Sequence, residues 1–426
     1  MYQAPRGTQD VLPEDAAYWT YVERTARRFA ALYGYGEIRT PTFEDTGLFL
    51  RGVGGGTDIV EKEMYSFEDK GGGHLTLRPE GTASVVRAYL EHGMASRPQP
   101  VKVHTFVNCF RYDRPQRGRY REFHQWDCEA IGEIDPLVDA EMITLLWRFY
   151  EGLGLRDLTL ELNSIGDAKC RPAYLDELRA YYRPLVHDLC GDCRRRLETN
   201  PLRLLDCKVP TCQPAIAGAP RLLDRLCAEC AEHFAAVRRY LADVGIPATI
   251  NPRLVRGLDY YTKTVFEVWP AEAGAQSALG GGGRYDGLAE QLGGRPTPGI
   301  GFATGIERII LNLKQQGVEV PPSVKPQVFV AHVGEAARRE AARLTDALRR
   351  RGVPTLVSVG NRGMKAQMRQ ANTAGVAWTV IVGDDELAAG EVQVKPMAGG
   401  EQERVPLADV AAWLADRVGG DSRGDD

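Results

Sequence analysis

Residues 110–132, FRYDRPQRGRYREFHQWDCEAIG, combine arginines, aromatic rings and carboxylates in one short segment. Apolar and polar residues alternate on both sides of Pro115 and Gly118, so we predict two strands joined by a turn at these residues. Every second side chain of a strand lies on one face. The returning strand therefore carries an aromatic ring, an amide and two carboxylates on a single face near Arg111: Phe123, Gln125, Asp127 and Glu129. This arrangement predicts a binding site rather than a solvated basic loop.

A carboxylate also precedes a predicted helix over about residues 83–92. Thr82 is placed to cap the start of this helix, and Gly93 is placed to end it. Glu80 would then lie just before the amino terminus, where the helix dipole favours a negative charge. From this stretch alone, a plain capping acid and a ligand-binding acid explain Glu80 equally well.

The segment RGLDYYTKTVFEV is predicted to be another strand, preceded by Arg256. Strand alternation would place Tyr261, Lys263 and Glu267 on one face and Tyr260 on the other. Taken singly, an arginine at a strand edge is most often solvated, and adjacent tyrosines more often pack than recognise a ligand.

Two glycine-rich segments follow. GGGGRYDG at 280–287 resembles a phosphate-binding loop, but no Gly-Lys dipeptide occurs in the chain, which excludes a Walker A site. We expect its glycines to let the backbone approach a ligand or a neighbouring strand. GIGFATGIERII predicts a short strand that leads into a helix with Arg308 near its first turn, where free N–H groups can meet an anion. Taken singly, Arg308 is more typical of a surface residue.

Together these segments predict a ligand with a phosphate chain, an aromatic base and a small molecule with polar ends. Arginine guanidinium groups hold phosphates in a forked geometry, and Phe123 could stack on a purine. Glu80, Gln125 and Glu129 could bind an amine and a polar side chain.

Seven of the nine cysteines lie between residues 170 and 245. They include two CxxC pairs with two more cysteines between them: Cys190 and Cys193, Cys227 and Cys230, Cys207 and Cys212. CxxC pairs are typical of zinc sites, but the gap between these pairs is wider than in a zinc ribbon. We expect buried thiols by default and predict no metal site.

The composition predicts a globular protein without membrane contacts. A chain of 426 residues has room for roughly two to four domains. No apolar run approaches the roughly 20 residues of a membrane span, and the first residues carry no secretory signal. Nine cysteines without an export signal indicate the reducing cytoplasm. Because the net charge is −4, any nucleic acid must bind through local basic patches.

The order of predicted elements indicates an α+β core interrupted by a helical insertion, followed by a separate α/β unit. A helix over 14–33 precedes an extended segment broken at Pro41, and another helix covers 135–153. After residue 326 the pattern is β-α-β-α-β. The predicted domains are the core in two parts, the insertion, the α/β unit and a disordered tail: 1–169 and 251–322, 170–250, 326–420, and 421–426.

The motifs resemble those of the histidyl-tRNA synthetases, a family of class II aminoacyl-tRNA synthetases, over essentially the full length. FRYDRPQRGRYREFHQ is similar to class II motif 2, GIGFATGIERI to motif 3, and IRTPTFED with Pro41 to the dimer-forming motif 1. RGLDYYTKTVFEV is similar to a signature peculiar to the histidine enzymes. The resemblance implies a catalytic domain built on an antiparallel sheet, a helical insertion, a C-terminal anticodon-binding α/β domain and a cytoplasmic homodimer.

The resemblance also implies a reaction. L-histidine would be activated by ATP, with Mg²⁺ on its phosphates, to histidyl-adenylate, and histidine would then pass to the 3′ end of tRNA(His). Arg111 and Arg256 would be catalytic at the α-phosphate, with Arg256 in a place that other class II enzymes give to a metal ion. Arg119 and Arg308 would contact the outer phosphates, and Phe123 would stack on adenine. The histidine pocket would comprise Glu80, Gly81, Thr82, Gln125, Glu129, Arg256, Tyr260, Tyr261 and Tyr285.

Basic surfaces are expected to contact the tRNA. The turn with Gln116 and Arg117 would face the acceptor end. Arg362, Lys365 and Arg369 recur at i, i+3 and i+7 on one predicted helix face, which would contact the anticodon arm. A solvated charge stripe is the alternative interpretation.

The chain departs from the family pattern at Trp126 and Asp127, where smaller residues are expected. Asp127 shares the pocket face, so we expect it to alter hydrogen bonding there. Two other functions fit the same fold: a histidine-sensing regulatory subunit of ATP phosphoribosyltransferase, and an RNA-binding protein with an inactive core. The extra domain at 327–420 disfavours the first, and the intact set of arginines disfavours both.

Overall fold

A computed structural model describes residues 2–54, 57–270, 278–322 and 324–418. The chain forms two compact units, which divide between Val320 and Pro321. The tail predicted for 421–426 lies outside the described residues, and the predicted domain boundaries stay a prediction. Within the described parts of the chain, no helix is long and apolar enough to cross a membrane.

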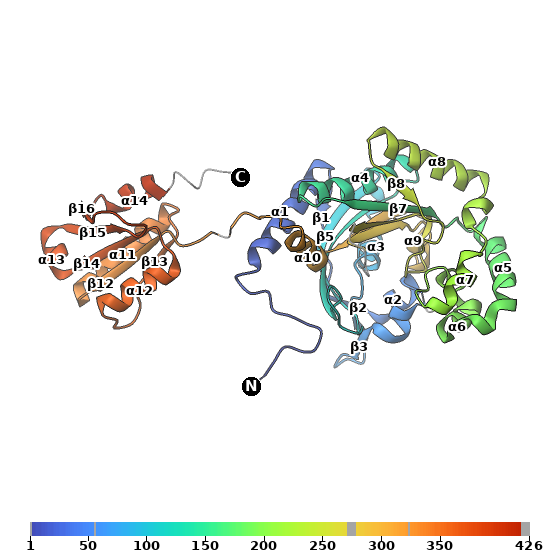
Figure 1. The fold of residues 1–426 in the computed structure, drawn as a ribbon, viewed down its shortest axis with the longest axis horizontal. Helices are drawn as coiled ribbons and strands as arrows, with labels where there is room; N and C mark the ends of the chain where they lie inside the picture. The colour runs from blue at the N-terminus through green and yellow to red at the C-terminus, as the bar shows by residue number, and fades with distance from the viewer. Residues whose placement is uncertain (1, 55–56, 271–277, 323, 419–426) are drawn as a thin grey trace. The chain divides into compact units, whose positions relative to one another are not determined.

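An eight-stranded sheet forms the centre of the first unit (Figure 1). Six of its strands run antiparallel to their neighbours, while the edge strands β1 and β8 pair in parallel with β5 and β7. This confirms the expected antiparallel core. In spatial order the strands are β1 (Gly36–Glu37), β5 (Val101–Phe110), β6 (Glu122–Ile131), β11 (Gly299–Gly305), β10 (Gly280–Arg284), β9 (Thr262–Pro270), β7 (Leu158–Ser164) and β8 (Ala248–Ile250).

Four helices contribute apolar side chains to the main core on one face of this sheet. They are α1 (Ala16–Leu32), α4 (Pro136–Gly152), α8 (Ala228–Asp243) and α10 (Ile306–Gln315). From β6, the side chains of Trp126, Cys128 and Ala130 belong to this core. The alternate residues of β6 therefore face the other side of the sheet, as the strand period predicts, and the predicted helices at 14–33 and 135–153 are confirmed.

A buried ion pair fastens the sheet to two of these helices. Arg284 of β10 has a fully buried side chain, and its Nη2 donates to Asp139 Oδ1 of α4 at 2.5 Å. His233 of α8 contacts the other oxygen of Asp139, with Nε2 and Oδ2 2.8 Å apart. Burial opposes the charged carboxylate, but the charges and hydrogen bonds of Arg284 and His233 together outweigh it and lower the pKa of Asp139 below its ordinary value.

Small elements border the other face of the sheet. A three-stranded sheet consists of β2 (Phe43–Asp45), β4 (His74–Leu77) and β3 (Tyr65–Glu68), and the helices nearby are α2 (Thr46–Gly52), a π-helical turn (Ile59–Glu63), α3 (Thr82–Glu91) and α9 (Leu288–Gln291). The extended segment predicted around Pro41 continues as far as Asp45, and α2 begins at Thr46. Asp45 caps α2, because its Oδ1 accepts from the N–H of Gly47 at 2.7 Å. The strands β3 and β4 form an antiparallel hairpin.

The predicted helical insertion is helical as far as Asp243 and contains α5 (Arg171–Tyr182), α6 (Gly191–Thr199) and α7 (Gln213–Ala217), drawn in green in Figure 1. In the last part of the predicted range, β8 is a strand of the main sheet and α8 packs into the main core. A strand of three residues is too short to show a period in the sequence.

The second unit contains a five-stranded sheet in the order β13 (Thr355–Val357), β12 (Val328–Val333), β14 (Trp378–Gly383), β15 (Glu391–Pro396) and β16 (Glu403–Pro406). Its helices are α11 (Glu335–Arg350), α12 (Met364–Ala374), α13 (Asp384–Ala389) and α14 (Val410–Val418). The first three strands are parallel, which confirms the predicted β-α-β-α-β order. The pattern did not predict the antiparallel strands β15 and β16.

Candidate active site

The polar face of β6 forms the floor of the candidate site. Gln125, Asp127 and Glu129 lie on the face opposite the main core, as the strand period predicts. Cys109 of the neighbouring strand donates from Sγ to Gln125 Oε1 at 3.3 Å and fixes the orientation of the amide.

Glu129 is buried and accepts two hydroxyl hydrogen bonds. Thr82 Oγ1 donates to its Oε1 at 2.7 Å, and Tyr285 Oη donates to its Oε2 at 2.6 Å. Burial nevertheless raises the pKa of Glu129 to about 8. At neutral pH this carboxyl therefore retains a proton in much of the population and can donate as well as accept.

Glu80 caps α3, in place of the predicted Thr82. The N–H groups of Thr82 and Ala83 each donate to the Glu80 carboxylate at 2.9 Å. The hydroxyl of Thr82 is engaged by Glu129, so it cannot turn back to the helix end. Tyr260 Oη donates to Glu80 Oε2 at 3.3 Å, and burial raises the pKa of Glu80. Glu80 is thus a capping acid that also contacts the pocket.

Tyr260 and Tyr261 lie together, so their predicted placement on opposite faces was wrong. β9 begins only at Thr262, and Lys263 has a positive φ of 47°, so the strand alternation does not extend back to the tyrosines. The two tyrosine rings have centroids 4.7 Å apart, and the ring of Tyr285 lies 5.9 Å from that of Tyr260. These buried rings enclose the two carboxyls.

Asp127 is the least satisfied group of the site. Both of its carboxylate oxygens are buried, and neither has a hydrogen-bond partner among the described residues. Burial, together with the charges of Glu129 and Glu80, raises its pKa well above the ordinary value. A Cβ added to Gly81 would overlap an oxygen of Asp127, so only glycine leaves room for this carboxyl. In the described part of the chain, none of the three neighbouring carboxyls of Glu80, Asp127 and Glu129 forms an ion pair, although Arg111 acts on Glu80 and Asp127 through its charge. They therefore predict a ligand with N–H donors.

The glycines of β10 admit close contacts from both neighbouring strands. A Cβ on Gly282 would overlap the carbonyl oxygen of Gly301. A Cβ on Gly281 would lie 3.1 Å from Arg256 Nη1, and one on Gly283 would lie 2.9 Å from Tyr261 Cδ1. The expected close backbone approach is confirmed on the side of the neighbouring strands.

Arg256 is held in a half-buried ion pair with Glu267 of β9, which corrects the interpretation of a solvated edge residue. Burial opposes the charged form, but the charge of Glu267 raises the pKa of Arg256 above its ordinary value. The guanidinium carbon lies 5.9 Å from the ring centroid of Tyr261. A permanent positive charge is therefore fixed beside the tyrosine pocket.

Arg111 connects the hairpin to the acid pocket. Its Nε donates to the carbonyl oxygen of Pro79 at 2.8 Å, directly before Glu80, and its guanidinium carbon lies 5.3 Å from the ring centroid of Phe123. The charge of Arg111 partly offsets the effect of burial on the pKa of Glu80.

Arg308 lies close to the other arginines that were predicted for the site. Its Nε donates to the carbonyl oxygen of Gly118 in the hairpin turn, and its Nη1 donates to that of Ala278, each at 3.0 Å. Burial and the repulsion of three neighbouring cations lower the pKa of Arg308 to about 10. These neighbours are Arg119, Arg111 and Arg256. Clustered guanidinium groups create a strongly positive potential, which predicts an anionic ligand.

Two supporting contacts escaped prediction from the sequence. Glu267 was assigned only to a strand face, although its spacing of eleven residues from Arg256 allows the ion pair. Glu307 of α10 accepts from the backbone N–H of His124 at 2.9 Å, and its Oε1 also lies 2.9 Å from His124 Nδ1. This clamp connects the α10 terminus that carries Arg308 to β6. In the sequence, the position of Glu307 directly before Arg308 was the only indication of this contact.

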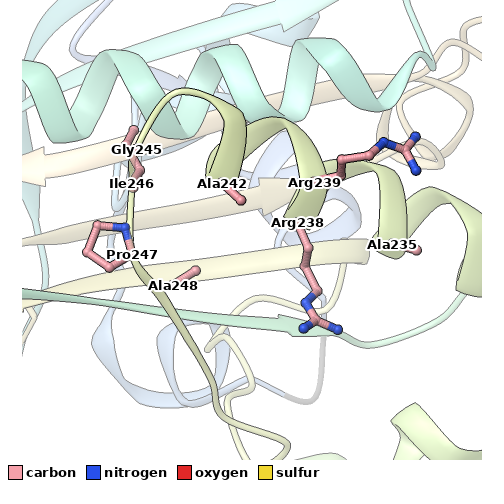
Figure 2. A pocket seen from close by; sticks show the side chains of 8 residues that line it. All are labelled: Ala235, Arg238, Arg239, Ala242, Gly245, Ile246, Pro247 and Ala248. Carbon is pink, nitrogen blue, oxygen red and sulfur yellow. The ribbon is translucent and has the colours of Figure 1, made fainter.

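One surface depression borders the candidate site, and a second one lies elsewhere on the first unit. A depression of about 200 Å³ is bordered by Arg256, Asp259 and Tyr261 of the site and by Asn200 and Arg203 of the insertion. A larger depression of about 750 Å³ lies between α8 and the start of β8 (Figure 2), away from the arginines and carboxyls described above. We place the candidate site by its chemistry rather than by cavity size.

The residues predicted to contact tRNA are exposed. Gln116 and Arg117 lie in the hairpin turn. In the second unit Lys365 and Arg369 lie on the exposed side of α12. Arg362 precedes this helix, which corrects its expected place on the helix face, and its Nη1 donates to Gln370 Oε1 at 3.1 Å.

A model of the family described as "Histidyl-tRNA synthetase" matches residues 7–170 and 207–309, and a model of the anticodon-binding domain matches residues 327–417. The chain belongs to the histidyl-tRNA synthetase family. It is 56% identical to a histidine–tRNA ligase of Dehalococcoides mccartyi (strain ATCC BAA-2266 / KCTC 15142 / 195) over 96% of this chain and 97% of the relative. It is 51% identical to the histidine–tRNA ligase of Pelotomaculum thermopropionicum over 98% of each chain.

Solved structures of the synthetase family share the fold. Apo histidyl-tRNA synthetase of S. aureus superimposes with a TM-score of 0.82 at 41% identity, covering 97% of this chain and 100% of that chain. A Bacillus halodurans C protein described as an ATP phosphoribosyltransferase regulatory subunit/histidyl-tRNA synthetase gives a TM-score of 0.63 at 21% identity, covering 90% and 98%. The latter likeness shows the fold alone. The predicted family and fold class are confirmed.

Proposed function

We propose that this synthetase activates L-histidine with ATP to histidyl-adenylate and transfers histidine to the 3′ end of tRNA(His). One observation supports this most directly: four arginine guanidinium groups converge beside three buried carboxyls on one face of an antiparallel sheet. The first group suits a phosphate chain, and the second suits a small ligand with N–H donors.

In the proposed first step, the histidine carboxylate attacks the α-phosphorus of ATP in line and pyrophosphate leaves. Negative charge then develops on the α-phosphoryl oxygens. Arg111 and Arg256, held by Pro79 and Glu267, would stabilise this charge with little reorganisation. Arg119 and Arg308 would contact the outer phosphates of the substrate, which arrives as Mg·ATP, while Phe123 stacks on adenine.

The acid pocket would recognise histidine by hydrogen bonding. A neutral imidazole has one donor and one acceptor, and a carboxyl that both donates and accepts, such as Glu129, suits either ring nitrogen. Glu80 and Tyr260 would contact the ammonium group. An amino acid without these groups would leave buried polar atoms unpaired, which discriminates more strongly than size does. The other residues predicted for the pocket, Gly81, Thr82, Gln125, Tyr261 and Tyr285, would line the same enclosure.

The ligase is favoured over the regulatory subunit of ATP phosphoribosyltransferase. Relatives named histidine–tRNA ligase match almost the whole chain, and the second unit matches an anticodon-binding domain. The regulatory protein is related only at the level of the fold.

We further propose that the tRNA contacts the hairpin turn at Gln116 and Arg117 and the second unit at Arg362, Lys365 and Arg369. Exposure of all five side chains supports this assignment. The segment around Pro41 is assigned to a homodimer interface on its resemblance to motif 1, and a cytoplasmic location is assigned on the composition.

Exchange of labelled pyrophosphate into ATP tests the proposal with each of the twenty amino acids offered separately. We expect exchange with histidine alone. If histidine binds without exchange, the regulatory function becomes the better explanation. If another amino acid supports exchange, the pocket assignment is wrong.

A further inference from the structure

Four cysteines of the insertion come together in space. Cys190 precedes α6, Cys193 lies in the first turn of this helix, and Cys207 and Cys212 lie in the loop that follows it. Their four sulfur atoms all lie within 4.8 Å of one another. Three of the four cysteines are buried, and Cys190 is half-buried. The family model passes over residues 171–206, where the first two cysteines lie.

The spacing of the sulfur atoms fits a metal rather than a disulfide. The Sγ atoms of Cys190 and Cys207 are 3.9 Å apart. A disulfide requires about 2.0 Å between its sulfur atoms. Tetrahedral Zn²⁺ with zinc–sulfur bonds of about 2.3 Å separates its ligand sulfurs by about 3.8 Å. The described geometry therefore needs little movement to accept a zinc ion.

Backbone amides are aimed at three of these sulfur atoms. The N–H of Cys193 donates to Cys190 Sγ at 3.5 Å, that of Val209 to Cys207 Sγ at 3.4 Å, and that of Cys190 to Cys212 Sγ at 3.2 Å. N–H donors of this kind stabilise metal-bound thiolates and orient them toward the metal. They come from the turns at the start of α6 and after Leu204, so the local backbone is shaped around the sulfurs.

We propose that Cys190, Cys193, Cys207 and Cys212 bind one Zn²⁺ in a closed tetrahedral site. Four protein ligands leave no open position, so the ion is structural rather than catalytic. This changes our interpretation of the sequence, which considered the two CxxC pairs as one ribbon and then expected metal-free thiols. In the structure each pair belongs to a different group of ligands.

A second group of four carries an independent inference of the same kind. Asp167, Cys170, Cys227 and Cys230 also place their ligand atoms within 4.8 Å of one another. The Sγ atoms of Cys170 and Cys230 are 3.9 Å apart, and the N–H of Asp167 donates to Cys170 Sγ at 3.5 Å. We infer a second Zn²⁺ here, with three thiolates and one carboxylate, which joins the start of α8 to the loop before α5.

The first site has a mechanical consequence for the pocket. Helix α6 starts at the cysteine group, and its Arg196 forms an ion pair with Asp58, with Nη2 and Oδ2 2.5 Å apart. Asn200, at its end, donates from Nδ2 to Asp259 Oδ1 at 2.6 Å. Asp259 directly precedes Tyr260. A metal at the start of α6 would therefore fix a helix that positions the pocket segment.

The metal content of the full-length protein tests both sites. The chain is produced in zinc-supplemented medium, purified with a reducing agent, and analysed for metals per chain by mass spectrometry. We expect two zinc ions in the unsubstituted protein, and loss of one in either double variant: Cys190→Ser with Cys212→Ser, or Cys227→Ser with Cys230→Ser. Cys128→Ala, at a buried cysteine outside both groups, is the matched control and should keep both ions. A double variant that keeps two ions overturns the site that it alters.

A second measurement does not depend on the variants folding. Zinc is removed from the unsubstituted protein under reducing conditions, circular dichroism establishes that the apoprotein is folded, and Co²⁺ is added. We expect the visible absorption of tetrahedral Co²⁺ and the ultraviolet band of thiolate ligation at two ions per chain, both abolished by Zn²⁺. Folded apoprotein without these bands overturns both sites. If the purified protein contains no zinc and its cysteines are oxidised in pairs, the two groups form disulfides and are not metal sites.

Discussion

At the scale of single residues, the candidate site depends on charges that the fold holds apart from water. Arg256 is paired with Glu267, whereas Asp127 has no partner among the described residues. Burial determines the charge state of each group, since desolvation penalises ions and a fixed counterion restores them. The chemistry of these residues therefore follows from their surroundings as much as from their type.

Arg256→His tests the proposed stabilisation of the transition state. We expect kcat for histidine-dependent pyrophosphate exchange to fall by about 100-fold, with a smaller change in KM, because a guanidinium at the α-phosphate acts mainly when charge develops. Glu267→Gln, which keeps the guanidinium, is the control for loss of the ion pair. An unchanged kcat for the histidine variant would remove Arg256 from the mechanism.

Glu129→Gln tests the buried carboxyl through the pH dependence of stability. The folded-state pKa of Glu129 is about 8, above its ordinary unfolded value. The neutral form therefore stabilises the fold below the unfolded pKa, and this contribution is lost as the pH rises toward about 8. Relative to the glutamine variant, the ligand-free protein should lose about 1.4 kcal/mol per pH unit between these values. Urea denaturation at a series of pH values measures the difference, and parallel curves for the two proteins would contradict the raised pKa.

At the scale of elements, contacts between distant segments hold the site residues in place. α10 is clamped to β6 by Glu307, α6 holds the segment before Tyr260, and β10 is fastened to α4 and α8 by Arg284. Each clamp joins segments that are far apart in the chain, so the site is rigid only when the whole unit is folded.

Arg284→Met tests the clamp on β10. We expect the unfolding free energy of the first unit to fall by about 3 to 5 kcal/mol, because the substitution leaves the buried charge of Asp139 with only its contact to His233. Urea denaturation measures this loss. Adding Asp139→Leu removes the stranded charge and should recover part of the stability. If the second substitution instead lowers the unfolding free energy by as much again as the first, the loss of the ion pair is not the cause.

At the scale of the whole molecule, the two units have separate cores and separate proposed functions. The first unit contains the arginines and carboxyls of the candidate site, and the second unit matches an anticodon-binding domain. Changes on the surface of the second unit should therefore alter tRNA binding without altering adenylate formation.

Replacing Arg362, Lys365 and Arg369 together with Gln tests this division. We expect weaker tRNA binding and a shallower salt dependence, by roughly 0.7 to 0.9 in the logarithmic slope for each lost phosphate contact. Pyrophosphate exchange should not change. The matched control removes the same charge from the exposed Arg338, Arg339 and Arg343 on α11. Equal effects of the two triple variants would indicate general electrostatics rather than a binding face.

The sequence alone determined the local structure and the family of this protein. The longer helices α1, α3, α4, α11 and α12, the polar face of β6 and the strand-to-helix step before Arg308 follow from short-range periodicity, because neighbouring residues alone set these patterns. The motif resemblances identified the family because they depend on residue order.

Only the tertiary structure decided how distant groups meet. The ion pair of Arg256 with Glu267, the raised pKa of Glu129, the joint placement of Tyr260 and Tyr261 and the two ligand groups of cysteines all depend on burial and on contacts between separate elements. Strand alternation failed at Tyr260 because Lys263 takes a left-handed backbone conformation. Desolvation and approach in space are properties of the folded chain, and no local pattern of residues records them.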